Sequence, residues 1–169
     1  MLIIFSGLSG VGKSTIAKKL ASTIKATYLR VDTIEQSLRR QFPQKKIGPE
    51  GYLILYELAR ENLQQGSTVI TDSVNEFRFI RDDYRNIAQS LALPFLEIEV
   101  ICSDQKKHRL QAENRIPDIE GLTPPSWQAI NNRSYETWDR APLQLDTAFL
   151  SVEQSLTQIL QEIAIIQYP

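Results

Sequence analysis

Residues 7–14, Gly-Leu-Ser-Gly-Val-Gly-Lys-Ser, match the pattern G-x-x-x-x-G-K-[ST]. An uninterrupted apolar run at 2–5 precedes them and indicates a buried strand, while apolar residues with helical spacing follow over 13–24. A glycine-rich loop between a strand and a helix lets backbone N–H groups approach an anion, and the helix N-terminus adds a partial positive charge. This segment therefore predicts a phosphate-binding loop on an α/β framework.

The pattern also assigns roles to single residues for the binding of a nucleoside triphosphate, which we expect to be ATP with Mg²⁺. Lys13 is expected to reach the β- and γ-phosphates and to act in catalysis, and the Ser14 hydroxyl is expected to ligate Mg²⁺. The residues of this segment predicted to bind ATP are Gly7, Leu8, Ser9, Gly10, Val11, Gly12, Lys13, Ser14 and Thr15.

The composition fits one globular domain over residues 1–169. The chain is 42% apolar and 23% charged, which argues against disordered, collagen-like and coiled-coil classes. Its net charge of -1 lacks the overall field of a general nucleic-acid binder. One cysteine excludes an internal disulfide, and one histidine argues against a zinc site. No apolar run is long enough for a signal peptide or membrane span, so we expect a cytoplasmic protein without a membrane partner.

Short apolar runs alternate with segments of helical periodicity. Strands are predicted at 2–5, 26–31, 67–71, 95–101 and 143–145, and helices at 13–24, 33–42, from about 49 to 65, at 77–91, at 104–115 and from 152 to 166. Strands separated by helices indicate βαβ units and a mostly parallel sheet covered on both faces. The proline-containing stretch 116–140 interrupts this alternation. We interpret residues 115–140, approximately, as a mobile lid, with a plain surface excursion as the alternative.

Two other classes of nucleotide-binding protein fit less well. A GTPase needs a guanine-reading N-K-x-D, which is absent, and the D-x-x-G at 118–121 lies in the proline-containing stretch and not at a strand end. A mechanical ATPase usually has a longer chain and paired acids after a strand, whereas the third predicted strand leads into the single acid Asp72. The small size and the predicted lid favour a kinase.

Two aspartates follow predicted strands, and ligands bind outside the carboxyl ends of parallel strands. Asp32 is a candidate base for an acceptor hydroxyl, and it is also placed to cap the following helix together with Glu35. Asp72 is expected to bind Mg²⁺ or the acceptor, because Ser73 and Glu76 already offer a capping box for the next helix. Both aspartates are therefore predicted site residues.

Arginines near these positions are candidates for phosphate contacts, because guanidinium groups bind phosphate oxygens in a fork. Arg115, at the junction of a polar helix with the lid, is the first candidate for the transferring phosphate, and Arg109 is predicted to bind ATP. Arg30, Arg39 and Arg133 are predicted to bind the acceptor. The alternative for these arginines is a solvated face, since acidic residues are interleaved with them.

The other polar and aromatic residues of this region receive structural roles. His108 is interpreted as a surface residue. Trp127, Tyr135 and Trp138 are interpreted as packing residues of the lid, with stacking on a ligand as the alternative.

Taken together, these segments resemble the small P-loop kinases that include phage-type polynucleotide kinase domains, chloramphenicol phosphotransferase, zeta-toxin-like kinases, and gluconate or shikimate kinases. The resemblance rests on the phosphate-binding loop within 5–14, on Arg30-Val31-Asp32, and on the segment Val-Ile-Thr-Asp-Ser-Val-Asn at 69–75. Residues 115–138 resemble the lid of bacterial chains described as predicted kinases or AAA family ATPases. Leu145-Asp146-Thr147 resembles the last strand end of the same chains.

The resemblance implies an α/β P-loop NTPase three-layer fold with a five-stranded parallel sheet in the order 2-3-1-4-5. It also implies that Asp32 is the general base, that Asp72 lies on the acceptor or Mg²⁺ side, and that Arg115 contacts the transferring phosphate. The lid differs from those of shikimate and gluconate kinases, so their acceptors are not carried over. The same difference argues against adenylylsulfate as the acceptor.

We therefore predict an ATP-dependent kinase that moves the γ-phosphoryl group to a hydroxyl of a small-molecule or nucleotide-like acceptor. Two alternatives stay open. One is a nucleoside monophosphate kinase, whose acceptor is a phosphate and needs no base, and the other is an ATP-binding regulatory module that does not turn over. A 5′-polynucleotide acceptor fits the near-neutral charge less well, although the basic residues within 39–46 would suit one.

Overall fold

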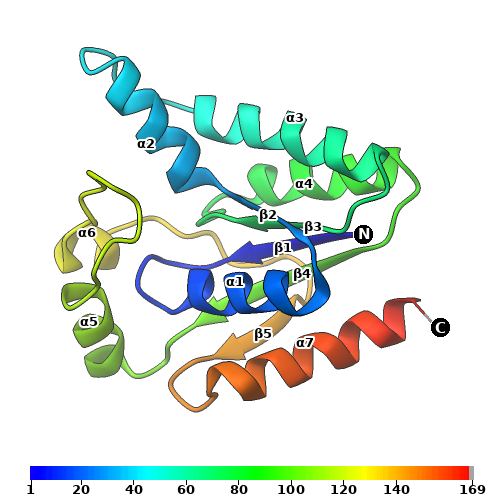
Figure 1. Cartoon of the computed structure of the whole chain (residues 1–169). Helices are drawn as coiled ribbons and strands as arrows, with labels where there is room; N and C mark the ends of the chain where they lie inside the picture. The colour runs from blue at the N-terminus through cyan, green and yellow to red at the C-terminus, as the bar shows by residue number, and fades with distance from the viewer. Residues whose placement is uncertain (168–169) are drawn as a thin grey trace.

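The computed structural model describes residues 1–167 and contains a five-stranded parallel sheet in the order β2-β3-β1-β4-β5 (Figure 1). This confirms the predicted sheet and its order. The strands are β1 (Leu2–Ser6), β2 (Thr27–Arg30), β3 (Val69–Asp72), β4 (Phe95–Ile101) and β5 (Leu143–Asp146).

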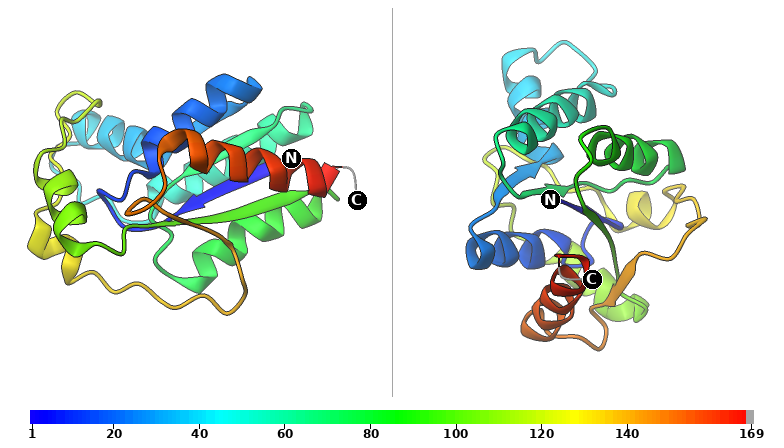
Figure 2. Two further views of the ribbon diagram at one scale, coloured as in Figure 1. Left: turned by 90° about the horizontal axis from the view of Figure 1, so that it is seen from below. Right: turned by 90° about the vertical axis from the view of Figure 1, so that its right-hand side faces the viewer.

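Helices cover both faces of the sheet and give three layers (Figure 2). One layer contains α1 (Lys13–Ile24) and α7 (Val152–Gln167), and the other contains α3 (Glu50–Gln64) and α4 (Arg78–Ser90), with α2 (Val31–Gln41) beside α3. Two short helices, α5 (Gln105–Glu113) and α6 (Trp127–Asn131), lie at the carboxyl ends of the strands (Figure 1). No helix within 1–167 combines the length and the apolarity that a membrane crossing requires.

The central strand β1 explains why both faces need a helical layer. Its side chains are all buried, and they alternate between the two cores: Ile3 and Phe5 pack with α1 and α7, whereas Leu2 and Ile4 pack with α3 and α4. A parallel strand that is buried on both faces has the continuous apolar sequence seen here.

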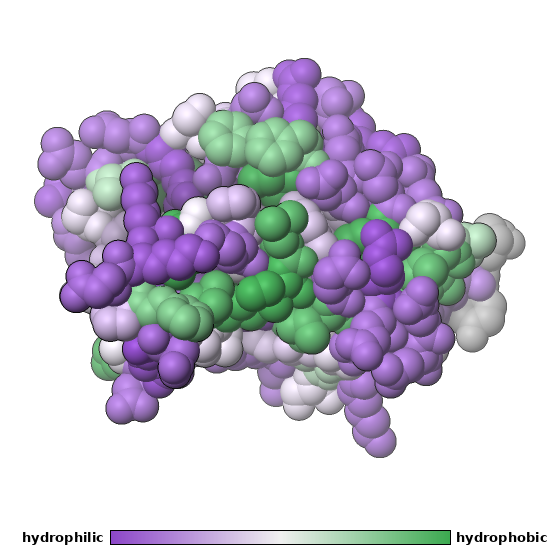
Figure 3. Space-filling model, turned by 90° about the horizontal axis from the view of Figure 1, so that it is seen from above, coloured by the Kyte–Doolittle hydropathy of each residue, from purple (hydrophilic) through white to green (hydrophobic). Residues whose placement is uncertain are grey.

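Seen from above, the surface over the α3 side carries a band of apolar side chains bordered by hydrophilic ones (Figure 3).

The end of β2 differs from the prediction in a way that matters for the site. Residue 31 was expected to be the last strand residue, but β2 pairs with β3 only as far as Arg30 opposite Asp72, and α2 begins at Val31. Val31 is buried in the core that α3 covers, and this packing favours the early turn into a helix. Asp32 consequently lies in the first turn of α2 and not on the strand.

Candidate active site

The phosphate-binding loop leaves β1 and enters α1 with three glycines in the left-handed region. Gly7, Gly10 and Gly12 have φ values of 132°, 85° and 98°. A side chain at Gly7 would collide with the Val100 carbonyl oxygen, so the close approach of the loop to β4 requires glycine there. The loop conformation thus depends on the residues that define the sequence pattern.

Lys13 is folded back over this loop. Its side chain is buried, and its Nζ donates to the Leu8 carbonyl oxygen at 3.1 Å. Burial lowers the pKa of the ammonium below its ordinary value, while the nearby carboxylates of Asp72 and Asp32 act in the opposite direction. A phosphate bound at the loop would stabilise this buried ammonium, because its oxygens supply negative charge next to the Lys13 Nζ.

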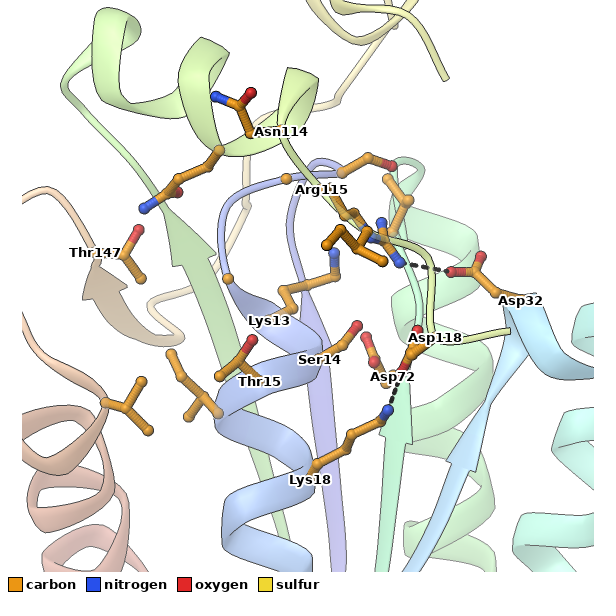
Figure 4. A pocket seen from close by; sticks show the side chains of 18 of the residues that line it. Lys13, Ser14, Thr15, Lys18, Asp32, Asp72, Asn114, Arg115, Asp118 and Thr147 are labelled. Carbon is orange, nitrogen blue, oxygen red and sulfur yellow. Dashed lines mark hydrogen bonds and ion pairs between the residues drawn. The ribbon is translucent and has the colours of Figure 1, made fainter. Parts of the chain in front are cut away.

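A cavity of about 650 Å³ opens above the loop (Figure 4). The phosphate-binding loop and α1 form its floor, and the two aspartates Asp32 and Asp72 lie on one side (Figure 4). Of the residues that follow α5, Arg115 lies above Lys13 and Asp118 lies beside Asp72 (Figure 4), and Ile116 also belongs to the lining. The size falls within the range of about 300–1,000 Å³ that is typical of small-ligand sites.

Asp72 is a buried carboxylate beside Ser14 at the floor of this cavity (Figure 4). The Tyr28 hydroxyl donates to its Oδ2 at 2.6 Å, and the Arg30 Nε lies 3.9 Å from the same oxygen. Burial together with the charge of Asp72 raises the pKa of Tyr28 well above its ordinary value, so the phenol stays a donor. Ser14 and Asp72 offer oxygen atoms only, which is the donor set that Mg²⁺ prefers.

The predicted capping box after β3 is wrong. The N-cap of α4 is Phe77, and the side chain that accepts from the first N–H of the helix, at Arg78, is that of Glu136 at 2.7 Å. Ser73 instead donates to the Asn75 Oδ1 at 2.6 Å, and Glu76 pairs with Arg133 at 3.0 Å. The backbone at Asn75 has a φ of 54°, and this turn places the start of α4 beyond the reach of both side chains.

Asp32 belongs to a charge cluster and not to a helix cap. The N-cap of α2 is Arg30 without a side-chain cap, so the capping alternative for Asp32 and Glu35 is wrong. The Asp32 carboxylate accepts from Arg30 at 2.9 Å and lies 4.0 Å from Arg115 (Figure 4). Glu35 pairs with Arg39 at 2.6 Å. Two guanidinium groups from different segments therefore converge on one carboxylate.

Asp118 completes this cluster, although its D-x-x-G segment does not follow a predicted strand and gave no reason to expect a site residue there. Its carboxylate accepts from Arg30 at 2.8 Å and from Lys18 of α1. Burial alone would raise the pKa of Asp118, but the Lys18 and Arg30 partners hold it well below its usual range. Burial likewise acts to lower the pKa of Arg30, and the surrounding carboxylates raise it above its ordinary value. The D-x-x-G letters were visible, but no local pattern links Asp118 to residues 88 and 100 positions away.

The predicted arginines occupy different places. The Arg115 side chain lines the cavity roof. Arg109 lies outside it and pairs with Glu113 along α5 at 2.9 Å. A further arginine, Arg140 before β5, is a packing residue, because its guanidinium pairs with Glu97 at 2.6 Å and with Asp82 at 2.7 Å. Only one arginine of the helix–lid junction thus reaches the space above the phosphate-binding loop.

A second cavity, of about 520 Å³, adjoins the first. It lies between α2, α3 and the segment 121–125, and Arg39, Arg40 and Arg133 line it. Asp32 lines both cavities. The acidic residue that carries two guanidinium partners therefore stands at the boundary between the space over the phosphate-binding loop and a basic-lined space next to it.

His108 is not at the surface, contrary to the prediction. It is buried, and its Nε2 donates to the Ser9 carbonyl oxygen of the phosphate-binding loop at 2.8 Å. The Trp127 ring packs edge-on against it at a centroid distance of 5.0 Å. The polar helix α5 therefore has a packing role that its sequence does not show, since a single apolar-facing histidine carries no periodic signal.

Thr147 is another contributor whose role only the fold shows. Its hydroxyl donates to the Val11 carbonyl oxygen at 2.9 Å, so the end of β5 supports the phosphate-binding loop from the side. The sequence offered the Leu-Asp-Thr resemblance at this strand end, but the contact itself is long-range.

Trp138 shows that the aromatic residues after α6 pack as predicted. Its Nε1 donates to Glu99 at 2.8 Å, and the Arg81 guanidinium lies 4.4 Å from its ring centroid and 5.1 Å from that of Tyr135. The aromatic residues therefore fasten the returning segment to α4 and β4.

The sheet order and the glycine-rich loop define a P-loop NTPase fold. A family model described as an AAA domain matches residues 2–120. The chain belongs to this AAA domain family.

Relatives of the chain include kinases. A protein of Aeropyrum pernix named a probable adenylyl-sulfate kinase is 26% identical across 94% of this chain and 90% of its own length. The adenylyl-sulfate kinase of Prochlorococcus marinus is 28% identical across 96% of this chain and 83% of its own length. The structure of the Mycobacterium tuberculosis APS kinase CysC in complex with AMPPNP and APS superposes with a TM-score of 0.69 at 19% identity, and the match covers 96% of each chain. That structural likeness shows a shared fold.

Proposed function

We propose that the chain is an ATP-dependent kinase that transfers the γ-phosphoryl group to a hydroxyl of a small-molecule or nucleotide-like acceptor. The observation that carries the proposal is the position of Asp32, which lines both the cavity over the phosphate-binding loop and the adjoining cavity. A kinase needs one group that reaches the transferring phosphate and the acceptor at once. The kinase names of the sequence relatives support the same activity.

In this proposal the loop residues 7–15 bind the phosphates of ATP, with Lys13 on the β- and γ-phosphates. Ser14 and Asp72 would hold Mg²⁺, which would supply positive charge against the phosphates during the transfer. The burial of Lys13 supports this role, because an ammonium in a water-poor site interacts strongly with an incoming anion.

Asp32 orients the acceptor hydroxyl and takes its proton as the oxygen attacks the γ-phosphorus, while the bond from that phosphorus to the β–γ bridging oxygen breaks and ADP leaves. Arg30 and Arg115 hold the carboxylate in place from two sides. Arg115 also reaches the space above the phosphate-binding loop, where it balances charge on the transferring group. The roof segment that follows Arg115 closes over the reactants as a lid of about residues 115–140 and keeps water from competing with the acceptor.

The acceptor occupies the second cavity, where Arg39 and Arg133 bind it. Asp72 reaches the acceptor from the first cavity, and Arg30 acts on it through the Asp32 carboxylate with which it pairs. The volume of about 520 Å³ suits a small polar molecule better than a polynucleotide end. We place the chain among kinases of the polynucleotide kinase, chloramphenicol phosphotransferase and zeta-toxin-like group on the strength of the motifs at 5–14, 30–32 and 69–75.

The test is ADP release from Mg-ATP, measured with the purified protein alone and with separate pools of nucleosides, sugars, antibiotics, 5′-hydroxyl oligonucleotides, adenylyl sulfate and nucleoside monophosphates. We expect one hydroxyl pool to raise ADP release, and Lys13→Ala to abolish the rise. Asp32→Asn should lower kcat about 10²- to 10⁴-fold with ATP binding intact, as expected for loss of a general base.

Two results would contradict the proposal. A response confined to nucleoside monophosphates that survives Asp32→Asn would indicate phosphate acceptors that need no base. Tight ATP binding without ADP release in any pool would favour the regulatory module.

A further inference from the structure

The cavity over the phosphate-binding loop has two ends, and only one of them takes part in the proposed transfer. Asp32, Asp72 and Arg115 line one end, and Thr147 with Leu150, Ser151 and Val152 lines the other (Figure 4). Gln111 follows Lys107 by one turn of α5, and the Lys107 Nζ bonds to the Thr147 carbonyl oxygen, so Gln111 lies toward the same end as Thr147. Lys13 and Ser14 lie between these ends, and Thr147 stands on the side opposite Asp32 (Figure 4). Since the γ-phosphate must face Asp32, the base of a bound nucleoside triphosphate extends toward Gln111 and Thr147.

Most polar side chains at this base end are already bonded to the protein. The Lys107 Nζ donates to the carbonyl oxygens of Thr147 at 2.6 Å and of Ala148 at 3.1 Å. The Thr147 hydroxyl donates to the Val11 carbonyl oxygen at 2.9 Å. Asn114 is exposed at the outer rim (Figure 4). These groups are therefore poorly placed to read the edge of a base.

Gln111 is the exception. Its Oε1 is buried and has no hydrogen-bond partner within residues 1–167, although its side chain belongs to the lining of the cavity. A buried amide oxygen without a partner is unfavourable, and native proteins retain few of them unless a ligand satisfies the group. Leu150 and Val152 line the same end and offer apolar contacts to the faces of a planar ring.

We propose that the Gln111 amide selects adenine over guanine in the nucleotide site. The amide turns about its last side-chain bond, so that Oε1 leaves its buried position and accepts from the N6 amino group while Nε2 donates to the adjacent ring nitrogen. This is the bidentate pairing that a glutamine amide makes with adenine. Guanine presents two acceptors, O6 and N7, at the same edge, while an amide offers a single donor group and an opposed oxygen. The inference rests on the proposed ATP binding and adds to it the residue that sets base specificity.

The test compares the Kd of Mg-ATP and Mg-GTP by calorimetry for the full chain and its variants. We expect the unmodified chain to bind ATP about 5- to 150-fold more tightly than GTP, the range for one bidentate pair. Gln111→Leu should bring the two Kd values to within about threefold, mainly through weaker ATP binding, because the pairing is lost for both bases. Gln111→Lys, which presents only donors, should shift the preference toward GTP.

Gln105→Leu is the matched control, because Gln105 lies on the same helix, is exposed and does not line the cavity. It should retain the full preference for ATP. Thermal unfolding without nucleotide checks folding, and Gln111→Leu should unfold at the same or a higher temperature, since it removes a buried unpaired oxygen.

The outcomes separate the two proposals. Equal affinity of the unmodified chain for ATP and GTP, or an undiminished ATP preference in folded Gln111→Leu, overturns the role of Gln111 and leaves ATP binding intact. Failure of the unmodified chain to bind either nucleotide overturns both proposals.

Discussion

The orientation of Asp72, a proposed Mg²⁺ ligand, is set by Tyr28, which does not line the cavity itself. The Tyr28 hydroxyl of β2 donates to it at 2.6 Å, and Asp72 is buried at the end of β3, opposite Arg30. A buried carboxylate keeps one orientation only when its oxygens are bonded. Tyr28 is therefore a positioning residue for the proposed Mg²⁺ site.

Tyr28→Phe should weaken the Mg²⁺ dependence of ATP binding, because it removes the hydroxyl and leaves the ring in place. Loss of such an outer partner typically costs about 10- to 100-fold in metal affinity or activity. The measurement is a Mg²⁺ titration of ATP binding. Tyr56→Phe is the control, because that hydroxyl bonds only weakly, to the Ile80 carbonyl oxygen at 3.4 Å. A Tyr28→Phe titration that matches the unmodified chain would show that Asp72 is held by other means.

The segment after α5 is fastened to the rest of the molecule by Asp118, which ties it to α1 through Lys18 and to β2 through Arg30. Its partners depress the pKa of Asp118. The carboxylate thus contributes stability that is present above the unfolded pKa of about 4 and is lost as the pH falls through the folded value. Because the side chain is 41% exposed, solvent screening keeps that contribution small.

Asp118→Asn should therefore lower the free energy of unfolding at pH 7 by less than about 1 kcal/mol. The difference from the unmodified chain should shrink as the pH falls below about 4. Amide hydrogen exchange over residues 115–125 should become faster in the variant at pH 7, since the tether is lost. Urea unfolding at several pH values gives the first quantity, and a difference that does not change with pH would contradict the ion-pair account.

The returning part of the same excursion is fastened by Arg81 of α4. This guanidinium is fully buried, donates to the carbonyl oxygens of Asn75 at 2.9 Å and Glu136 at 2.5 Å, and stacks on Trp138. The excursion is thus anchored near Asp118 and near Glu136, and the stretch between these anchors contains the roof of the second cavity.

Arg81→Ala should lower the free energy of unfolding by about 3 kcal/mol, because it leaves buried carbonyl groups without donors. Arg81→Lys should cost less, since it keeps the charge and loses the planar fork. Urea unfolding measures both. Arg60→Ala, at a partly exposed arginine on α3, should change stability by less than about 0.5 kcal/mol. An effect of Arg81→Ala as small as that of Arg60→Ala would show that the returning segment is held elsewhere.

At the scale of the whole molecule, local sequence patterns predicted the sheet and the phosphate-binding loop, but they did not predict the side-chain contacts between distant segments. The apolar run of β1, the helical spacing of α1 and the glycines between them depend on neighbouring residues, so the sheet and the phosphate-binding loop were predictable. The place of Asp118 depends on Lys18, 100 residues away, and burial of His108 depends on the Ser9 carbonyl oxygen. Pairings of this kind leave no periodic trace in the sequence, since each is set by the closure of the whole fold.

Stability of the complete chain offers the last prediction, because a ligand that binds only the folded state raises the unfolding temperature by mass action. Mg-ATP at about 100 times its Kd stabilises by about 2.7 kcal/mol, which for a chain of this size corresponds to a rise of roughly 5–11 °C. Lys13→Ala should abolish most of the rise, because it removes the buried cation that meets the phosphates. Differential scanning fluorimetry with ATP, with and without Mg²⁺, measures the shift. An equal shift in Lys13→Ala would place the nucleotide away from the phosphate-binding loop and contradict the site.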